Sequence, residues 1–335
     1  MYKIVVLLTV LALCAACEDA GQPGPVSVPT ESQHTGNDQG SKIAFVTDRD
    51  GPDPVGNSGN QEIYIMSPDG TDQTRLTNNL AIDGAPALSP SGRKIAFHST
   101  RENPGPPPRA IDIYLMNVDG TDQTQLTHLT ALGLGALDPA WAPNGRQVVF
   151  SSQVEPREIF VIDVDGTGLT NLTNHPARDA DPDWSPDGRS IAFTSSRDGN
   201  REIYVMGADG SAPTRLTFAA TIDERPAWSI DGRSIAFNSN RDGNQEIYVM
   251  NADGTEPVRL TFDAREDARS GWSPDGKQIV FDRRVETGHF EVFVMNADGT
   301  DQTRLTTSVA GAFSGFGSWG VGPVLPPRGP VISGD

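Results

Sequence analysis

The amino-acid sequence predicts an all-β fold, a six-bladed β-propeller of four-stranded blades whose ring is closed by a C-terminal strand. Three observations lead to it. A phrase that reads Ile-Tyr-Val-Met-x-Ala-Asp-Gly in its clearest copies recurs six times, at intervals of 44 to 50 residues. A second phrase, clearest as Trp-Ser-Pro-Asp-Gly-Arg-Ser-Ile-Ala-Phe at 184–193, recurs between these copies. Finally, the two ends of the repeat region carry incomplete units that complement each other.

Each repeat unit supplies four short strands in a fixed order. The first strand carries a Trp, the second an Ile-Ala-Phe run, the third an Ile-Tyr-Val-Met run and the fourth an Arg-Leu-Thr run. Asp-Gly or Asn-Gly pairs join first to second and third to fourth strands, and such pairs are the strongest short-range hairpin signal. Runs such as Ile203–Met206 are apolar at successive positions, which indicates strands covered on both faces, as in stacked blades.

The ends of the repeat region predict how the ring closes. The first unit begins at its second strand, Lys42–Phe45, with no Trp-bearing strand before it. The last unit is followed by an extra Trp-bearing strand, Gly317–Trp319. The two fragments make one complete blade, and a closed ring leaves no long unpaired strand edge.

The repeat phrase resembles a known family. Residues that match its pattern are Asp179, Pro182, Trp184–Gly188, Ile191–Phe193, Arg197–Asn200 and Glu202–Tyr204. They resemble the WD40-like (PD40) repeats of TolB-type propellers, over about residues 42–319. TolB-type proteins carry an α/β domain before the propeller and serve as a periplasmic partner of an outer-membrane lipoprotein. A polar tether stands in that place here, so the resemblance implies a lipoprotein variant without that domain, and it leaves any Tol–Pal role open.

The N-terminus predicts export and lipid anchoring. A short basic start precedes an apolar run, Ile4–Leu13, which is too short to span a bilayer as a helix. Cys14-Ala15-Ala16-Cys17 follows and resembles a lipobox, which implies cleavage after residue 16 and lipid attachment at Cys17. The alternative is an ordinary secretory signal with a stray cysteine. Residues 17–41 and 320–335, rich in Pro, Gly and polar residues, are expected to be a disordered tether and tail. We therefore expect a membrane-anchored lipoprotein of the bacterial envelope, in the periplasm or at the cell surface.

Composition narrows the function classes. The formal charge of −18 argues against nucleic acid and against polybasic contact with lipid. Cys14 and Cys17 are the only cysteines, and no Gly-x-Ser-x-Gly elbow occurs, so common covalent nucleophiles are missing. His98, His128, His175 and His289 fall at different positions of four units, without the spacing of a zinc site. The sequence therefore favours a binding protein over an enzyme.

Aspartates before the first strand are candidate metal ligands. Asp83, Asp179, Asp223 and Asp267 each stand five residues before the Trp of that strand, or before Leu88 in its place. Innermost strands start near the axis, so these carboxylates could converge on one mouth of the channel and hold Ca²⁺. The alternative is that they cap the preceding turn by side-chain hydrogen bonds. Two blades have Ala136 and Ser314 at this position, so such a ring is incomplete.

A second set of acids opens every third strand: Glu62, Asp112, Glu158, Glu202, Glu246 and Glu291. Arg49, Arg101, Arg197 and Arg241 stand just across the loops that lead into these strands. Six acids at equivalent positions predict an ion pair that belongs to the repeat rather than to a site.

Link lengths predict where a partner binds. Links from first to second and from third to fourth strand, on what we term the turn face, are constant in length. All variation lies on the opposite face, termed the loop face. Glu62 follows Phe45 by seventeen positions and Asp112 follows Phe97 by fifteen, where two other blades have nine. Long segments cluster at Gly51–Asn60, Glu102–Ala110 and Leu129–Leu137, and loops on rigid scaffolds usually carry binding. Tolerated insertion is the alternative.

The resulting hypothesis is a monomeric envelope module that binds a protein, peptide or glycan on the loop face. Two alternatives stay open: a metal-dependent carbohydrate-active enzyme using the channel mouth, and a structural envelope component. Fold alone does not choose among them, because function lies in sites carried by folds.

Overall fold

A computed structural model describes residues 40–50, 60–101, 111–129, 133–286, 288–308 and 312–321. All of them lie in one compact unit, Gln39–Asp335, and the other unit, Met1–Asp38, lies outside the described residues. The predicted signal segment and Cys17, nearly all of the tether and most of the tail therefore lie outside them as well. No helix in the described part of the chain is long and apolar enough to cross a membrane.

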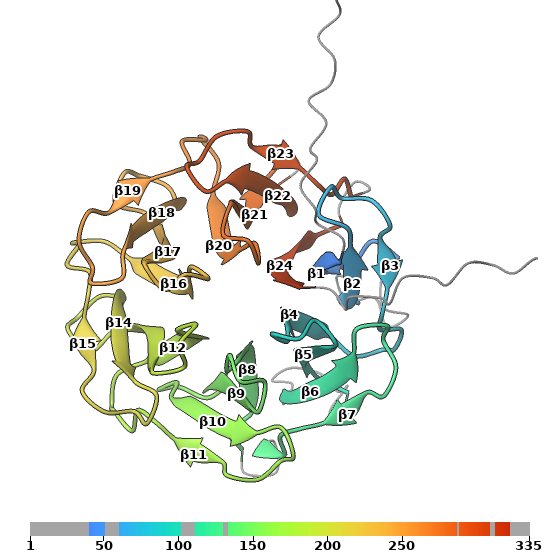
Figure 1. Cartoon of the computed structure of the whole chain (residues 1–335), viewed down its shortest axis with the longest axis horizontal. Coiled ribbons are helices and arrows are strands. Elements are labelled where there is room, and N and C mark those ends of the chain that lie inside the picture. Colours follow the sequence, from blue (N-terminus) through green and yellow to red (C-terminus); the bar gives the residue numbers. More distant parts are fainter. Residues whose placement is uncertain are drawn as a thin grey trace, which may run out of the picture. The chain divides into compact units, whose positions relative to one another are not determined.

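The described residues form six four-stranded antiparallel sheets arranged around a common centre, as predicted (Figure 1). From the innermost to the outermost strand, the blades are A, β24 (Ser314–Val321), β1 (Ser41–Thr47), β2 (Glu62–Met66) and β3 (Thr74–Arg75); B, β4 (Asp83–Leu88), β5 (Lys94–Ser99), β6 (Asp112–Asn117) and β7 (Thr124–Gln125); C, β8 (Ala136–Trp141), β9 (Gln147–Ser152), β10 (Ile159–Asp163) and β11 (Thr170–Asn171); D, β12 (Asp179–Trp184), β13 (Ser190–Ser195), β14 (Glu202–Gly207) and β15 (Thr214–Arg215); E, β16 (Asp223–Trp228), β17 (Ser234–Ser239), β18 (Glu246–Asn251) and β19 (Val258–Arg259); and F, β20 (Asp267–Trp272), β21 (Gln278–Arg284), β22 (Phe290–Asn296) and β23 (Thr303–Arg304).

The core lies between the blades, on both faces of the second strands. Each second strand contributes one Phe with no solvent exposure: Phe45, Phe97, Phe150, Phe193, Phe237 and Phe281. Each of these rings lies 5.7 to 5.9 Å from the aromatic ring of its neighbouring third strand. The continuous apolar runs in the sequence are thus explained, since every blade is covered on both sides by its neighbours.

Ring closure is confirmed in blade A. The C-terminal β24 pairs antiparallel with β1, with Trp319 opposite Ile43. Trp319 is 9% exposed, and its indole N–H donates to the Ser41 hydroxyl. β1 begins one residue earlier and β24 ends two residues later than the predicted limits 42 and 319.

The Asp-Gly turns also join neighbouring blades. Gly254, between β18 and β19, has a φ of +86°, and a Cβ at this position would lie 2.7 Å from the Leu216 carbonyl oxygen of blade D. Glycine is therefore required twice, by the left-handed backbone and by the close approach of the next blade.

Candidate ligand-binding channel

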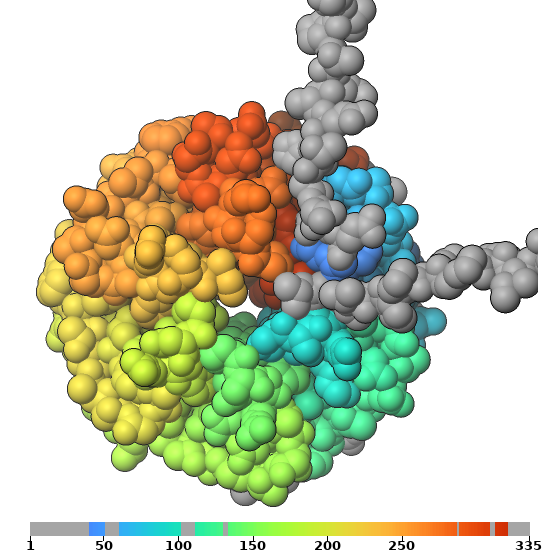
Figure 2. Space-filling view, in the orientation of Figure 1, coloured from blue at the N-terminus to red at the C-terminus, as the bar shows by residue number. Residues whose placement is uncertain are grey.

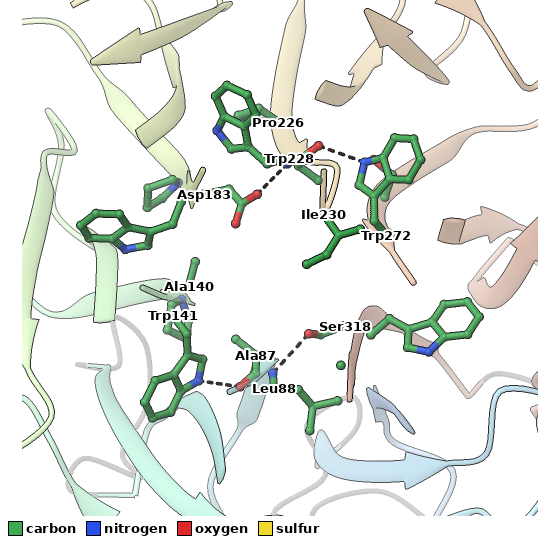
Figure 3. A pocket seen from close by; sticks show the side chains of 18 of the residues that line it. Ala87, Leu88, Ala140, Trp141, Asp183, Pro226, Trp228, Ile230, Trp272 and Ser318 are labelled. Atoms are coloured by element: carbon green, nitrogen blue, oxygen red, sulfur yellow. Dashed lines mark hydrogen bonds between the residues drawn. The ribbon is translucent and has the colours of Figure 1, made fainter. Parts of the chain in front are cut away.

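The first strands enclose a channel of about 540 Å³ at the centre of the ring (Figures 2 and 3). Its lining begins two residues into each first strand and runs to the turn face, at residues such as Pro186, Ile230 and Pro274. Prolines, alanines and tryptophans are half of the lining residues, and all five tryptophans of the protein are among them. The rings of Trp141, Trp228 and Trp272 point away from the centre of the channel (Figure 3). A mainly apolar hollow with a few polar groups is the usual form of a ligand site.

A bulge in every first strand turns one residue toward the channel. The pairing register shifts at this point, and the residue there has a positive φ: Ala85 (44°), Asp138 (52°), Asp181 (53°), Arg225 (58°), Arg269 (55°) and Phe316 (58°). All six line the channel, and we term them the bulge ring. Bulges redirect side chains, and left-handed residues other than glycine carry strain that proteins tend to keep at functional sites.

The preceding blade holds the bulge in place. The Arg225 backbone N–H donates to Thr194 Oγ1 at 2.9 Å, and that of Asp181 donates to Ser151 Oγ at 3.1 Å. In the same way, the N–H of Arg269 donates to Asn238 Oδ1 and that of Phe316 donates to Asp282 Oδ2. A polar second-strand side chain of one blade thus satisfies the N–H that the bulge of the next blade removes from the sheet.

The bulge ring divides charge between two sides of the channel. Asp138 and Asp181 stand on the neighbouring blades C and D, while Arg225 and Arg269 stand on blades E and F. Asp282, behind Arg269 at 3.5 Å, has its pKa raised to about 6 by burial, which the arginine partly offsets. Asp138 and Asp181, termed the acidic half of the ring, therefore adjoin Arg225 and Arg269, termed the basic half, and of these only Asp138 and Arg269 stand on opposite blades. The overall charge of the protein is strongly negative.

Asp183 adds a carboxyl group to the acidic side, two residues beyond Asp181 (Figure 3). The other blades have Ala87, Ala140, Ala227, Gly271 and Ser318 at this position. Its Oδ2 accepts the Trp228 backbone N–H at 2.7 Å, and burial raises the pKa of Asp183 to about 7. This side chain changes charge near neutral pH at the wall of the channel.

Replacing Asp183 with Asn is expected to remove a pH dependence of stability. The pKa is about 7 in the folded protein, against about 3.9 for an unfolded Asp. The folded state therefore holds the proton more tightly, and this contribution to stability is complete below pH 4 and lost as the pH rises through 7. Asn stays neutral and can still accept the Trp228 N–H.

In calorimetry, the Tm of Asp183→Asn should equal that of wild type at about pH 3 and exceed it by roughly 8 °C at pH 8, because three pKa units correspond to about 4 kcal/mol. Asp187→Asn, on the exposed turn that follows, is the control and should show no gain at pH 8. A difference that stays constant from pH 3 to pH 8 would contradict the titration of Asp183.

The four aspartates expected to bind Ca²⁺ each lie in their own blade, and none of them lines the channel. Asp83, Asp179, Asp223 and Asp267 are fully buried and pair with Arg101, Arg197, Arg241 and Arg283 at 2.6 to 3.0 Å. Among the described residues, no three His, Cys, Asp or Glu side chains gather in a way that could hold a metal. One oxygen of Asp179 and one of Asp223 lack hydrogen-bond partners there. Calcium binding at these residues stays a prediction.

The acids that open the third strands have other partners than the sequence indicated. Glu62, Glu202, Glu246 and Glu291 pair with fourth-strand arginines, Arg75, Arg215, Arg259 and Arg304, at 2.7 to 3.1 Å. The expected partners Arg101, Arg197 and Arg241 contact the aspartates of the first strands instead. Strand register is the reason: Asp83 lies opposite Ser99, which brings Arg101, two residues further on, to its carboxylate.

The loop-face segments predicted to bind a partner lie largely outside the described residues. Asn60, Leu129 and the stretch 133–137 are the described parts. Leu129 and Ala136 are buried in the core between blades B and C, so these two residues are not available to a partner.

The bulge ring was missed at the level of sequence. In four units its member directly precedes the Pro of the first strand, and the position holds three different residue types: Ala85, Asp138, Asp181 and Arg225. Variation at one position of a regular phrase was the available signal. The sequence alone did not indicate that this residue turns into the channel, because the bulge depends on the neighbouring blade.

Comparisons with known proteins agree with this architecture. The family model described as TolB beta propeller domain matches residues 133–221 and 196–317, more than half of the chain. A protein TolB homolog of Chlorobium luteolum is 46% identical over 43 residues, which span 13% of this chain and 10% of that relative.

Solved structures share the fold. TolB from Acinetobacter baumannii superposes with a TM-score of 0.71 at 22% identity, covering 84% of this chain and 67% of that one. A putative TolB from Agrobacterium tumefaciens gives 0.61 at 22% identity, covering 85% of this chain and 99% of that one. On the six blades, the repeat phrases and the family match, the chain belongs to the TolB β-propeller (PD40) family.

Proposed function

We propose that this protein is a binding module of the bacterial cell envelope that takes a protein or peptide segment into its central channel from the turn face. The observation that supports this most is the channel itself, about 540 Å³ with apolar walls and charged side chains at one level. The bulges of Asp181, Arg225 and Arg269 are held on strained backbone by hydrogen bonds to the preceding blade, which is the preorganisation that recognition requires.

Filling the channel is expected to abolish partner capture. Ala227 lines the wall, and Ala227→Phe adds a ring to the channel with little change to the blade core. Thr170→Phe, on the exposed outermost β11, is the matched control. We expect wild type and Thr170→Phe to retain the same envelope proteins from a detergent extract, quantified by mass spectrometry, and Ala227→Phe to lose them by tenfold or more. If a folded Ala227→Phe protein captured its partners as well as wild type does, the channel would be excluded as the binding site.

The long segments 51–60 and 102–110 on the loop face are proposed to make a second contact with the partner. Shortening both to the Arg-Asp-Gly-Asn form of 197–200 should preserve the melting temperature. If these segments contribute to binding, capture should fall in this protein although its channel is intact. Unchanged capture would leave the channel as the whole site.

We propose further that the protein is a lipoprotein anchored through Cys17, and the Cys14-Ala15-Ala16-Cys17 sequence supports this. Cys17→Ser is expected to abolish labelling by a palmitate analogue and to release the protein into the soluble fraction, whereas Cys14→Ser should do neither. A single attached chain binds membranes only marginally, so anchoring depends on the full lipid modification. A Cys17→Ser protein that remains with washed membranes would rule out the lipid anchor.

A further inference from the structure

The charged residues of the bulge ring are only partly neutralised by the protein. Asp138 lies 3.7 Å from Arg157, and Arg269 lies 3.5 Å from Asp282. In the part of the chain that the structure describes, neither the Asp181 carboxylate nor the Arg225 guanidinium has an ion-pair partner within 4 Å. The first-strand aspartates behind the ring, by contrast, have arginine partners at 2.6 to 3.0 Å.

Like charges stand side by side on each half of the ring. Burial and the neighbouring Arg225 lower the pKa of Arg269 to about 10, and Arg269 stacks on Phe316, 3.6 Å from the ring centroid. The acidic half contains Asp138 and Asp181, and Asp183 adds a third carboxyl group to it. Burial raises the pKa of Asp183 to about 7. Burial lowers the pKa of Arg225 less than Asp181 and its neighbouring carboxylates raise it, so this charge is partly compensated within the protein. At Arg269 and Asp183 burial is not offset in this way, and a ligand charge of the opposite sign would stabilise their charged forms.

Two separate halves favour one class of ligand over the others. An anion without a cationic group would bind the arginines but meet the carboxylates on the adjoining blades. A cation without an anionic group would bind the carboxylates but be repelled by the arginines. A ligand that carries both charges satisfies both halves, and discrimination arises as much from these mismatches as from the favourable contacts.

We propose that the bulge ring binds the charged ends of an α-amino acid or short peptide, with its carboxylate on Arg225 and Arg269 and its ammonium group on Asp138 and Asp181. The planar guanidinium groups suit a carboxylate, which they can bind through two parallel hydrogen bonds. The apolar wall between the ring and the turn face, with residues such as Ala227, Ile230 and Pro274, receives the apolar side chain. This inference rests on the proposed role of the channel as the binding site.

Four derivatives of phenylalanine test it: the free amino acid, N-acetylphenylalanine, phenylalanine amide and N-acetylphenylalanine amide. Binding is measured by isothermal titration calorimetry and by the fluorescence of the five tryptophans, which stand on the strands that line the channel. We expect the free amino acid to bind at least tenfold more tightly than either singly blocked form, and the doubly blocked form to bind least. Equal binding of all four, binding of none, or preference for a blocked form would overturn the proposal.

Two variants test which half of the bulge ring binds the carboxylate and which binds the ammonium group. Arg225→Gln should erase the preference for a free carboxylate and keep that for a free amine, while Asp181→Asn should do the reverse. Arg225→Lys, which keeps the charge without the fork, should weaken the carboxylate preference only in part, and Arg233→Gln on an exposed turn should change nothing. If Arg225→Gln does not fold, Arg225→Lys and Asp181→Asn still carry the test.

The outcome is separable from that of the proposed function. If Ala227→Phe loses its envelope partner but the four derivatives bind alike, the zwitterion inference fails and the channel remains the partner site. If Ala227→Phe keeps its partner and no derivative binds, both fail.

Discussion

Removal of residues 315–335 is expected to prevent the ring from closing and to leave no cooperatively folded protein at 37 °C. The deletion takes away most of β24, which supplies the innermost strand of blade A and the Trp319 indole. Loss of a buried Trp alone costs about 3–5 kcal/mol, and β1 would also lose its ladder of hydrogen bonds on one side. Because net stability of a domain is about 5–15 kcal/mol, this loss consumes most or all of it.

Two further proteins control that experiment. Removal of residues 322–335 alone, which keeps β24 whole, should leave the urea midpoint unchanged. Trp319→Ala should lower the free energy of unfolding by about 3–5 kcal/mol, since Trp319 packs with Phe45 and Val280 across blades A and F. A protein lacking 315–335 that unfolds at the wild-type midpoint would contradict closure through β24.

Arg259→Met is expected to lower the free energy of unfolding by about 3 kcal/mol, near the lower end for breaking a buried pair. Glu246 is fully buried, and Arg259 pairs with it at 2.7 Å, while Thr261 donates its hydroxyl to the other carboxylate oxygen. Without Arg259 the carboxylate remains buried without its positive partner. Arg259 itself is partly exposed, which is why the lower end of the range applies.

The pH dependence identifies the cause. Burial already raises the pKa of Glu246 above its usual value, and loss of Arg259 raises it further. A raised carboxyl pKa stabilises the folded state at low pH and loses that contribution as the pH rises, so the defect of Arg259→Met should shrink below pH 5. Glu246→Gln combined with Arg259→Met should recover stability at pH 7 relative to Arg259→Met alone. Arg146→Met, at an exposed turn, is the control and should cost less than about 0.5 kcal/mol.

The repeat, the four strands of each blade, the count of six and the closure by Trp319 could all be predicted from the sequence. These features follow from local signals that are repeated along the chain. Asp-Gly turns select hairpins, and apolar runs such as Ile203–Met206 require cover on both faces. Because six copies of the repeat are present, irregularities in any single unit do not obscure the pattern. The architecture can therefore be predicted without knowing which side chains are in contact.

Which charged side chains form ion pairs, and which residues line the channel, became clear only from the folded structure. The sequence placed Glu246 near Arg241, yet strand register brings Arg259 to Glu246 and gives Arg241 to Asp223. The bulge that turns Arg225 inward depends on the hydrogen bond that its backbone N–H donates to Thr194 of the preceding blade, 31 residues earlier. Ion-pair choice and side-chain direction depend on distances between strands that are remote in sequence, and only packing of the closed ring fixes those distances.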